Sequence, residues 1–221
     1  MWIVNLEMRW KDMKVDIFNT DKKYSIIYAD CPWDYSYVGK NFDKNFTKSK
    51  NGFSPVVSAK DHYDTMSNQQ IKELPVKELT EKNCLLFIWI TAPLLEIGME
   101  VIKAWGFEYK TKAFTWNKKA LMPGFYTMSQ IEDCYVAKKG NIPKPRGIRN
   151  CRQFYETFFD NLPEYYEEKR SLHSRKPDEF RIRIEKMFPE QNKLELFARK
   201  EKNTLIPDTR FDNWDIWGKE A

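Results

Sequence analysis

Short apolar runs rich in β-branched and aromatic residues alternate along this chain with stretches whose apolar residues recur at helical spacing. The strand-like runs are Tyr24–Ala29, Cys84–Thr91, Glu108–Asn117, Glu132–Lys138 and Lys193–Arg199, followed by a short terminal element at Asn213–Glu220. Alternation of this kind is typical of a sheet whose strands are connected by helices. It predicts an α/β fold with a doubly wound sheet and helices on both of its faces.

The helices expected between these strands have recognisable starts. Ser67 is a candidate N-cap for the first, and Pro93 and Pro177 suit the first turns of two others. Gly106 would end the helix that Pro93 opens. Because no internal repeat or low-complexity segment interrupts this order, we expect residues 1–221 to form a single domain.

Composition excludes several classes of protein. Hydrophobic residues make up 42% of the chain and aromatic residues 15%, enough for a full core, which excludes wholesale disorder. The longest uncharged apolar run, Cys84–Ala92, is far shorter than the roughly 20 residues of a membrane-spanning helix. Residues 1–14 mix acids and bases within their apolar stretch, which is wrong for a secretory signal. We therefore expect a cytoplasmic protein that does not bind membranes.

The metal and cofactor signatures most easily recognised in a sequence do not occur. The 4 cysteines, Cys31, Cys84, Cys134 and Cys151, form no C-x-x-C pair, and the chain has 2 histidines, so we expect reduced thiols and no metal site. Neither G-x-G-x-x-G nor G-x-x-x-x-G-K-[ST] occurs, which excludes the ordinary dinucleotide and nucleoside-triphosphate cradles. The net charge of +5 permits a polyanionic partner without requiring one.

The residues with the clearest chemical meaning follow the first strand. Asp30, Cys31, Pro32 and Trp33 stand where Tyr24–Ala29 ends, and ligands bind at the carboxyl ends of strands in open α/β sheets. Proline stiffens the turn and sets the direction of the Cys31 carbonyl. Asp30 adds a second acceptor and Trp33 a flat stacking surface. Two acceptors beside an aromatic face suit the exocyclic amine of a heterocyclic base, whose lone pair would then face a donor.

This tetrapeptide resembles the [DNS]-P-P-[FWY] signature of amino-group methyltransferases, and the rest of the chain resembles the MT-A70 family of adenine-N6 methyltransferases. Eight segments occur in the family's order, namely IIYADCPW, HYDTM, LLFIWITAP, WGFEYKTKAFTWNKK, IEDCYVAKKG, HSRKPDEF, KLELFAR and NWDIWGKE. The prokaryotic and phage branch, which modifies DNA, looks nearer than the eukaryotic messenger-RNA branch, because we expect a bare catalytic domain. The resemblance implies S-adenosylmethionine as methyl donor and a permuted Rossmann-like sheet in which the catalytic motif precedes the cofactor strand.

The resemblance also implies roles by position. The catalytic loop would be Asp30, Cys31 through its carbonyl, Pro32 and Trp33, with Asp30 beside the cofactor as well. The other residues expected around the cofactor are Lys176 near its carboxylate, Arg199 near its ribose, Gly218, Lys219 and Glu220 at the ribose hydroxyls, and Asp16 and Ile17 beside its adenine. Tyr63 and Glu132 match positions on the substrate side. This chemistry needs no metal.

Two basic stretches are candidates for nucleic-acid contact. Residues 138–152 hold 6 cations and no acid, among them Lys144, Arg146 and Arg149, and residues 34–61 mix lysines with rings such as Tyr35. We expect these loops to grip a DNA duplex while the target adenine flips out, although a solvated loop is the commoner fate of a charge run. The acidic and aromatic stretch 153–168 is assigned instead to core packing or self-association, which leaves a homo-oligomer open.

Two departures from the family pattern keep other functions open. The family usually has a proline where this chain has Cys31, and an amide where this chain has Lys219. Within the same class, the alternative to DNA is adenine-N6 methylation of RNA. From a different class, the alternative is a catalytically silent nucleic-acid-binding partner.

Overall fold

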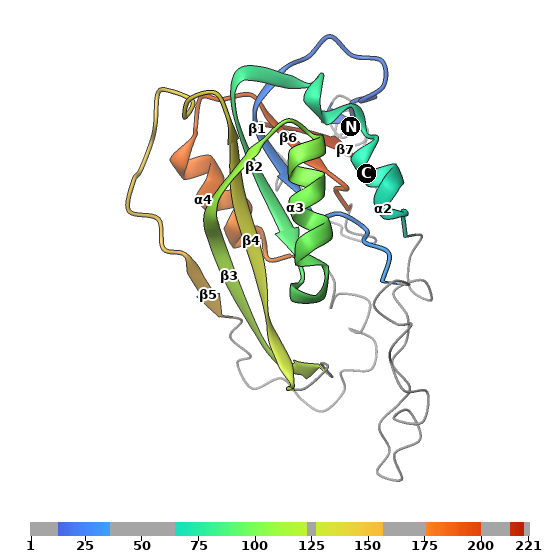
Figure 1. The fold of residues 1–221 in the computed structure, drawn as a ribbon. Helices are drawn as coiled ribbons and strands as arrows, with labels where there is room; N and C mark the ends of the chain where they lie inside the picture. The colour runs from blue at the N-terminus through green and yellow to red at the C-terminus, as the bar shows by residue number, and fades with distance from the viewer. Residues whose placement is uncertain (1–12, 36–64, 123–126, 157–175, 200–212, 219–221) are drawn as a thin grey trace, which may run out of the picture.

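The computed structural model describes residues 13–35, 65–122, 127–156, 176–199 and 213–218. Within them lies a seven-stranded sheet with the order β5-β3-β4-β2-β1-β6-β7 (Figure 1). The strands are β1 (Tyr24–Ala29), β2 (Thr80–Ile90), β3 (Glu108–Met122), β4 (Ser129–Lys139), β5 (Phe154–Glu156), β6 (Lys193–Leu196) and β7 (Trp214–Trp217). The helices are α2 (Asn68–Lys72), α3 (Leu95–Ala104) and α4 (Asp178–Met187), with the 3-10 helices η3 (Pro75–Lys77) and η4 (Ala92–Leu94).

Strand directions bring the ends of several strands to one edge of the sheet. β1 pairs in parallel with β2 and β6, β6 with β7, and β3 with β5, while β4 runs antiparallel to both β2 and β3. β1 lies between β2 and β6. From β1 the chain continues to one side of the sheet through β2 and later returns to the other side through β6, so the strand order reverses at β1. A crevice forms outside the carboxyl end of a strand at such a switch point. The residues after Ala29 lie at this point.

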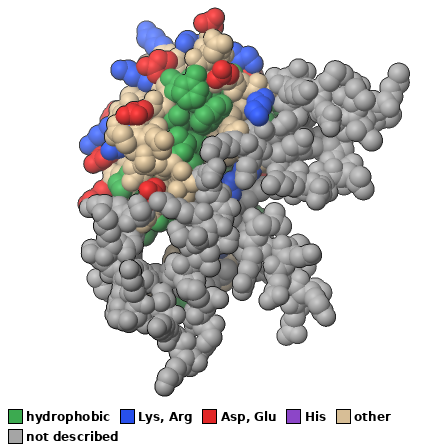
Figure 2. Space-filling model, turned by 90° about the vertical axis from the view of Figure 1, so that its right-hand side faces the viewer, with side chains coloured by type: hydrophobic (Ala, Val, Ile, Leu, Met, Phe, Trp, Pro, Cys, Tyr) green, Lys and Arg blue, Asp and Glu red, His purple; other side chains and the backbone are tan. Residues whose placement is uncertain are grey.

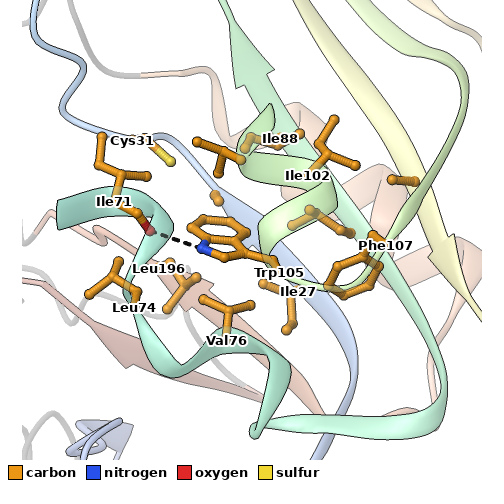
Figure 3. Close-up of a cluster of buried hydrophobic side chains, with 14 of the residues drawn as sticks. Ile27, Cys31, Ile71, Leu74, Val76, Ile88, Ile102, Trp105, Phe107 and Leu196 are labelled. Carbon is orange, nitrogen blue, oxygen red and sulfur yellow. Dashed lines mark hydrogen bonds between the residues drawn. The ribbon is translucent and has the colours of Figure 1, made fainter. Parts of the chain in front are cut away.

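Helices cover both faces of the sheet, as the alternation predicted. On one face α2 and α3 pack around Trp105, whose indole N–H donates to the Ile71 carbonyl at 2.9 Å (Figure 3). On the other face α4 packs Phe180 and Ile184 against Trp89 and neighbouring aromatic side chains. The prediction of a mixed α/β fold is therefore confirmed.

The predicted helix starts also appear in the structure. Ser67 caps α2 through a capping box with Gln70, and α4 begins directly after Pro177. The helix expected after Pro93 is divided into η4 and α3, and Gly106 follows α3 with a φ of 81°. A positive φ is the conformation that glycine adopts without steric cost.

Some strand bounds differ from the prediction for identifiable reasons. β2 begins at Thr80 instead of Cys84, because Thr80 already pairs with Tyr24 of β1. β6 stops at Leu196, because Phe197 has a left-handed φ of 63°. β5 was not predicted, since 153–168 was assigned to packing or self-association. Its residues pair in parallel with the middle of β3 and form the edge of the sheet.

The described surface carries charge of both signs. On the side shown in Figure 2, acidic and basic side chains of the described residues are interspersed around an apolar area. Among the described residues, no helix combines the length and the apolar character that crossing a membrane requires.

Candidate active site

Hydrogen bonds on both sides hold the corner that follows β1. The Cys31 carbonyl accepts the Trp33 N–H at 2.9 Å, and the Pro32 carbonyl accepts the Met66 N–H at 3.0 Å. The Trp33 indole N–H donates to the Trp89 carbonyl at 3.0 Å, and Trp33 is only 3% exposed. These contacts supply rigidity that the family's first proline would otherwise give, so the turn is fixed with cysteine in that place.

A hollow opens beside this corner, at the carboxyl edge of β1 and β2. Its volume is about 460 Å³, a figure that includes the open solvent at its mouth. It is lined by residues from several separate segments: Asp30, Cys31, Trp33, Tyr35, Trp89, Ile90, Thr91, Glu132, Asp133, Lys176 and Arg199. The hydroxyl groups of Tyr35 and Thr91 share a hydrogen bond of 2.9 Å. The topology therefore gathers distant parts of the sequence around Asp30.

A second, shallow hollow adjoins the first on the β6 side, with a volume of about 350 Å³ that includes open solvent. It is lined by Tyr28, Asp30, Lys176, Arg181, Glu195, Phe197 and Arg199. Three of these residues, Asp30, Lys176 and Arg199, line both hollows. Asp30 thus stands at the common wall, where one carboxylate can face two different ligands.

Four charges of alternating sign form a chain that ends on Asp30. The Lys118 Nζ lies 2.8 Å from the Glu132 Oε1. The Glu132 Oε2 lies 3.1 Å from the Lys176 Nζ, which in turn lies 2.8 Å from the Asp30 Oδ1. The side chains are between 11% and 23% exposed, and the Lys176 ammonium also lies 5.4 Å from the centre of the Trp89 ring. Because the charges cancel, the chain can be mostly buried without a net charge.

The contacts among these four side chains fix the ionisation of the two in the middle, Glu132 and Lys176. Burial by itself would raise the pKa of Glu132, but Lys176 and Lys118 outweigh it and lower that pKa to about 2. Burial would lower the pKa of Lys176, but the carboxylates of Asp30 and Glu132 outweigh it and raise that pKa above its ordinary value. At neutral pH Glu132 is therefore an anion and Lys176 a cation.

A second ion pair lies on the β6 side. Arg181 of α4 donates to both carboxylate oxygens of Glu195, with Nε to Oε2 at 2.5 Å and Nη2 to Oε1 at 3.0 Å. Its Nη1 also lies 3.0 Å from Asp178 Oδ1. Burial raises the pKa of Glu195, and the guanidinium offsets only part of this. Glu195 is therefore a carboxylate whose charge is less firmly held than that of Glu132.

Most of the predicted cofactor residues lie at this edge. Lys176 and Arg199 line both hollows, and the Lys176 ammonium contacts the carboxylates of Asp30 and Glu132. Lys14 bridges in parallel to Ile216 of β7. The next residues along the chain, Asp16 and Ile17, therefore approach the carboxyl end of β7, where the ribose and adenine contacts were expected.

Gly218 follows β7 directly and touches the end of β6. A side chain at Gly218 would place its Cβ 2.8 Å from the Ala198 carbonyl oxygen, so the close contact of the two strand ends requires glycine. Lys219 and Glu220 lie outside the described residues. A ribose contact by these residues stays a prediction.

The predicted substrate residues are only partly brought together. Glu132 and Tyr35 line the first hollow. Tyr63 and most of the loop 34–61 lie outside the described residues.

The basic loop packs against the carboxyl end of α4. Gly147 and Ile148 donate backbone hydrogen bonds of 2.9 and 3.0 Å to the carbonyls of Met187 and Lys186, at the carboxyl end of α4. The Arg146 guanidinium lies 5.6 Å from the centre of the Phe188 ring. Carbonyls at a helix carboxyl terminus lack partners within the helix, which explains why the loop binds there.

This position separates the loop from the two hollows. Lys176 precedes the first turn of α4, and a helix of 10 residues spans about 15 Å. The structure therefore places the loop that carries Lys144, Arg146 and Arg149 at the other end of α4 from Lys176. Their contact with a more distant part of a nucleic acid stays a prediction.

Sequence reasoning did not single out several residues of the site, among them Trp89, Lys118, Arg181 and Glu195. One signal was present, since Glu195 is the only acid inside the apolar run KLELFA. A charge in a buried strand needs a partner, and that partner is a candidate site residue.

The similarity of this chain to known proteins extends over the whole described fold. The MT-A70 family model matches residues 24–220. The chain is 42% identical over 204 residues to the Type II methyltransferase M.MunI of Mycoplasma sp, covering 90% of this chain and 78% of that protein.

Eukaryotic relatives are more distant. The chain is 27% identical to an N(6)-adenosine-methyltransferase MT-A70-like protein of Arabidopsis thaliana and 25% identical to the N(6)-adenosine-methyltransferase catalytic subunit METTL3 of Homo sapiens. Each alignment covers 90% of this chain but only 24% and 28% of those proteins. The prediction that the prokaryotic branch is nearer is confirmed. Because the family model extends from β1 past β7, this chain belongs to the MT-A70 family.

Proposed function

We propose that this chain, as a single cytoplasmic domain, transfers a methyl group from S-adenosylmethionine to the N6 amine of adenine in DNA. Membership of the family and the similarity to a Type II methyltransferase support this reaction. The observation that supports it most is the position of Asp30 at the common wall of two adjoining hollows. Transfer of a group between two ligands needs two sites that meet at one point, because the reacting atoms of both ligands must approach each other in a reactive geometry.

We assign the hollow on the β6 side to the methyl donor. S-adenosylmethionine supplies, when bound, a methyl group that its sulfonium makes electrophilic. Lys176 and Arg199 suit its carboxylate, and Asp30 and Glu195 suit its ammonium group. Phe197, which the left-handed backbone brings into this wall, offers an apolar surface to the adenosyl part. The residues present therefore fit this donor.

We assign the hollow beside Glu132 to the target base. Asp30 and the Cys31 carbonyl accept N–H hydrogen bonds from the base amine and so orient its lone pair. Lys176 engages the Oδ1 of Asp30 at 2.8 Å and so holds this carboxylate in place. As positive charge develops on the amine, these acceptors stabilise it without having to reorganise.

The wall of this hollow keeps its shape when a base enters. Trp33 is anchored through its indole N–H on the Trp89 carbonyl, and the Lys176 ammonium lies over the Trp89 ring. Side chains held in this way lose little further freedom on binding, which favours a preorganised site.

The test is methylation of matched DNA and RNA oligonucleotides with a labelled donor, followed by identification of the methylated nucleoside. We expect N6-methyladenine in DNA, and none with the Asp30→Ala variant. Labelling of single-stranded RNA in preference to DNA would establish the RNA alternative. Absence of transfer together with no calorimetric binding of the donor would instead establish a silent nucleic-acid-binding partner.

A further inference from the structure

Lys118 lines neither of the two hollows, yet its ammonium contacts a carboxylate that lines one of them. We propose that Lys118 is a positioning residue for the transfer reaction and acts on Asp30 through the two charged side chains between them. The inference rests on the proposed function and adds to it a residue that touches neither ligand.

The strand register explains why Lys118 meets Glu132. Trp116 of β3 is paired with Glu132 of β4, and Lys118 is two residues further along β3. Side chains two residues apart on a strand share a face, and Trp116 lies on the face that α4 covers. The ammonium and the carboxylate therefore lie on the same face as Lys176, which stands just before α4.

Each oxygen of the Glu132 carboxylate has its own lysine. Oε1 contacts Lys118 and Oε2 contacts Lys176, so the carboxylate cannot rotate without losing a cation. Without Lys118, both oxygens would compete for Lys176. That competition draws the Lys176 ammonium toward β4 and weakens its contact of 2.8 Å with Asp30.

Lys118 also balances the charge of the site. With it, the chain of four side chains is neutral, and without it the chain carries one negative charge. Besides Asp30 and Lys176, the titratable groups that line the first hollow with Glu132 are Cys31, Tyr35, Asp133 and Arg199. The thiols of Cys31 and of Cys134, the second residue after Glu132 on β4, are neutral, because burial raises their pKa. Loss of Lys118 therefore raises the pKa of Glu132 from about 2 toward its ordinary value.

The test is steady-state methylation by the Lys118→Met variant of the full chain from about pH 3.5 to about pH 7, a range that includes the ordinary pKa of a glutamate. We expect kcat to fall by about tenfold, the factor that corresponds to one unit of pKa, while the KM for the donor changes by less than about twofold. The acid limb of the kcat profile should move to higher pH, because Glu132 is now protonated more easily. A purely structural role would lower activity without moving this limb.

Two single variants serve as controls. Lys118→Arg keeps the cation and should restore most of kcat and the position of the acid limb. Lys112→Met removes a lysine from the same strand whose Nζ lies 2.8 Å from Asp133 Oδ2 and whose side chain is 40% exposed, against 17% for Lys118. We expect Lys112→Met to leave kcat and the limb unchanged.

A double variant tests whether Lys118 acts through Glu132. In a Glu132→Gln background, Lys118→Met should cause little further loss, because the path is already broken. An additional tenfold loss there, or a wild-type profile for Lys118→Met alone, would overturn the proposal.

If the wild-type chain methylates neither DNA nor RNA, the proposed function fails, but the side-chain coupling can still be measured. Carbon-13 NMR of labelled glutamate carboxylates should then show a higher pKa for Glu132 in Lys118→Met than in the wild type. An unchanged pKa would refute the coupling independently of any activity.

Discussion

The two sides of Asp30 each carry a glutamate, and the two glutamates differ in charge control. On the β4 side, Glu132 lies between two lysines, which lower its pKa to about 2 in spite of burial. On the β6 side, burial raises the pKa of Glu195, which faces one arginine and also the negative charges of Asp178 and Asp30. Burial raises the pKa of both carboxylates, and two cations reverse this shift at Glu132 whereas one does not at Glu195.

This difference suits the two ligands we assign. A carboxylate held firmly as an anion fixes Lys176 and with it the reacting corner, whichever base enters. Glu195 is more easily protonated, so a cationic ligand that approaches it stabilises its ionised form. In this assignment, Glu132 on the β4 side stays ionised and holds Lys176 in place, whereas the ionisation of Glu195 on the β6 side depends on the bound ligand.

The largest expected effect comes from the residue that both sides share. Asp30→Ala should lower methyl transfer by about a thousandfold or more, within the range attributed to a catalytic acid or base. Donor affinity should fall by less than about tenfold, because Lys176 and Arg199 remain. Single-turnover rates and calorimetric titration measure the two quantities. Asp215→Ala, which removes a carboxylate bound to Lys22 and Tyr24, serves as control and should keep the rate.

The next largest effect should come from breaking the pair on the β6 side. Arg181→Met leaves Glu195 buried without its cation and should lower the free energy of unfolding by about 3–5 kcal/mol at pH 7. Lys22→Met removes a pair in which the lysine is 56% exposed and should cost no more than about 1 kcal/mol. Urea denaturation of both variants measures the difference.

The same variant gives a pH dependence of defined sign. The pKa of Glu195 in the folded protein is raised above its unfolded value, and removal of Arg181 raises it further. A raised carboxyl pKa means that the folded state binds protons more readily, so lowering the pH relieves the penalty. The loss caused by Arg181→Met should therefore be smaller at pH 5 than at pH 8. An equal loss at both pH values would show that the unpaired charge of Glu195 is not its cause.

A smaller effect should separate the two sides by ligand. Glu195→Gln should weaken donor binding by about tenfold, or about 1.4 kcal/mol, whereas Glu132→Gln should change it by less than about threefold. Donor titrations of both variants test this split at constant pH. Equal losses would mean that the two hollows do not bind different ligands.

The sequence could predict the parts of this site that depend on local order. The corner after β1 follows from a strand that ends in Asp30 and Pro32, and the start of α4 follows from Pro177. Pairing across β3 and β4 could not be predicted, because the register shifts between Tyr109 and Thr111 and again before Phe114. Each shift of one residue turns a side chain to the other face, so the meeting of lysine and glutamate depends on details beyond periodicity.

For the basic loop, the sequence predicts the composition but not the position in the fold. Its composition was visible at once, but its position depends on backbone hydrogen bonds to the last turn of α4, and no charge pattern encodes these. Three-residue β5 was missed for a similar reason, since an aromatic pair beside an acid has no strand periodicity of its own. Both segments take their place from tertiary contacts.

The smallest expected effect concerns this loop. Composition alone would predict that Lys144→Ala combined with Arg149→Ala weakens DNA binding and lowers its salt dependence, since each lost phosphate contact reduces the slope of log K against log salt by about 0.9. Because the loop lies at the carboxyl end of α4, only a duplex that extends along this helix can reach it, and without such contact Kd and the slope stay unchanged. Binding measured at several salt concentrations distinguishes the two. A slope reduced by about two units would mean that the duplex extends along α4 from the target base, and that the far end of this helix belongs to the nucleic-acid interface.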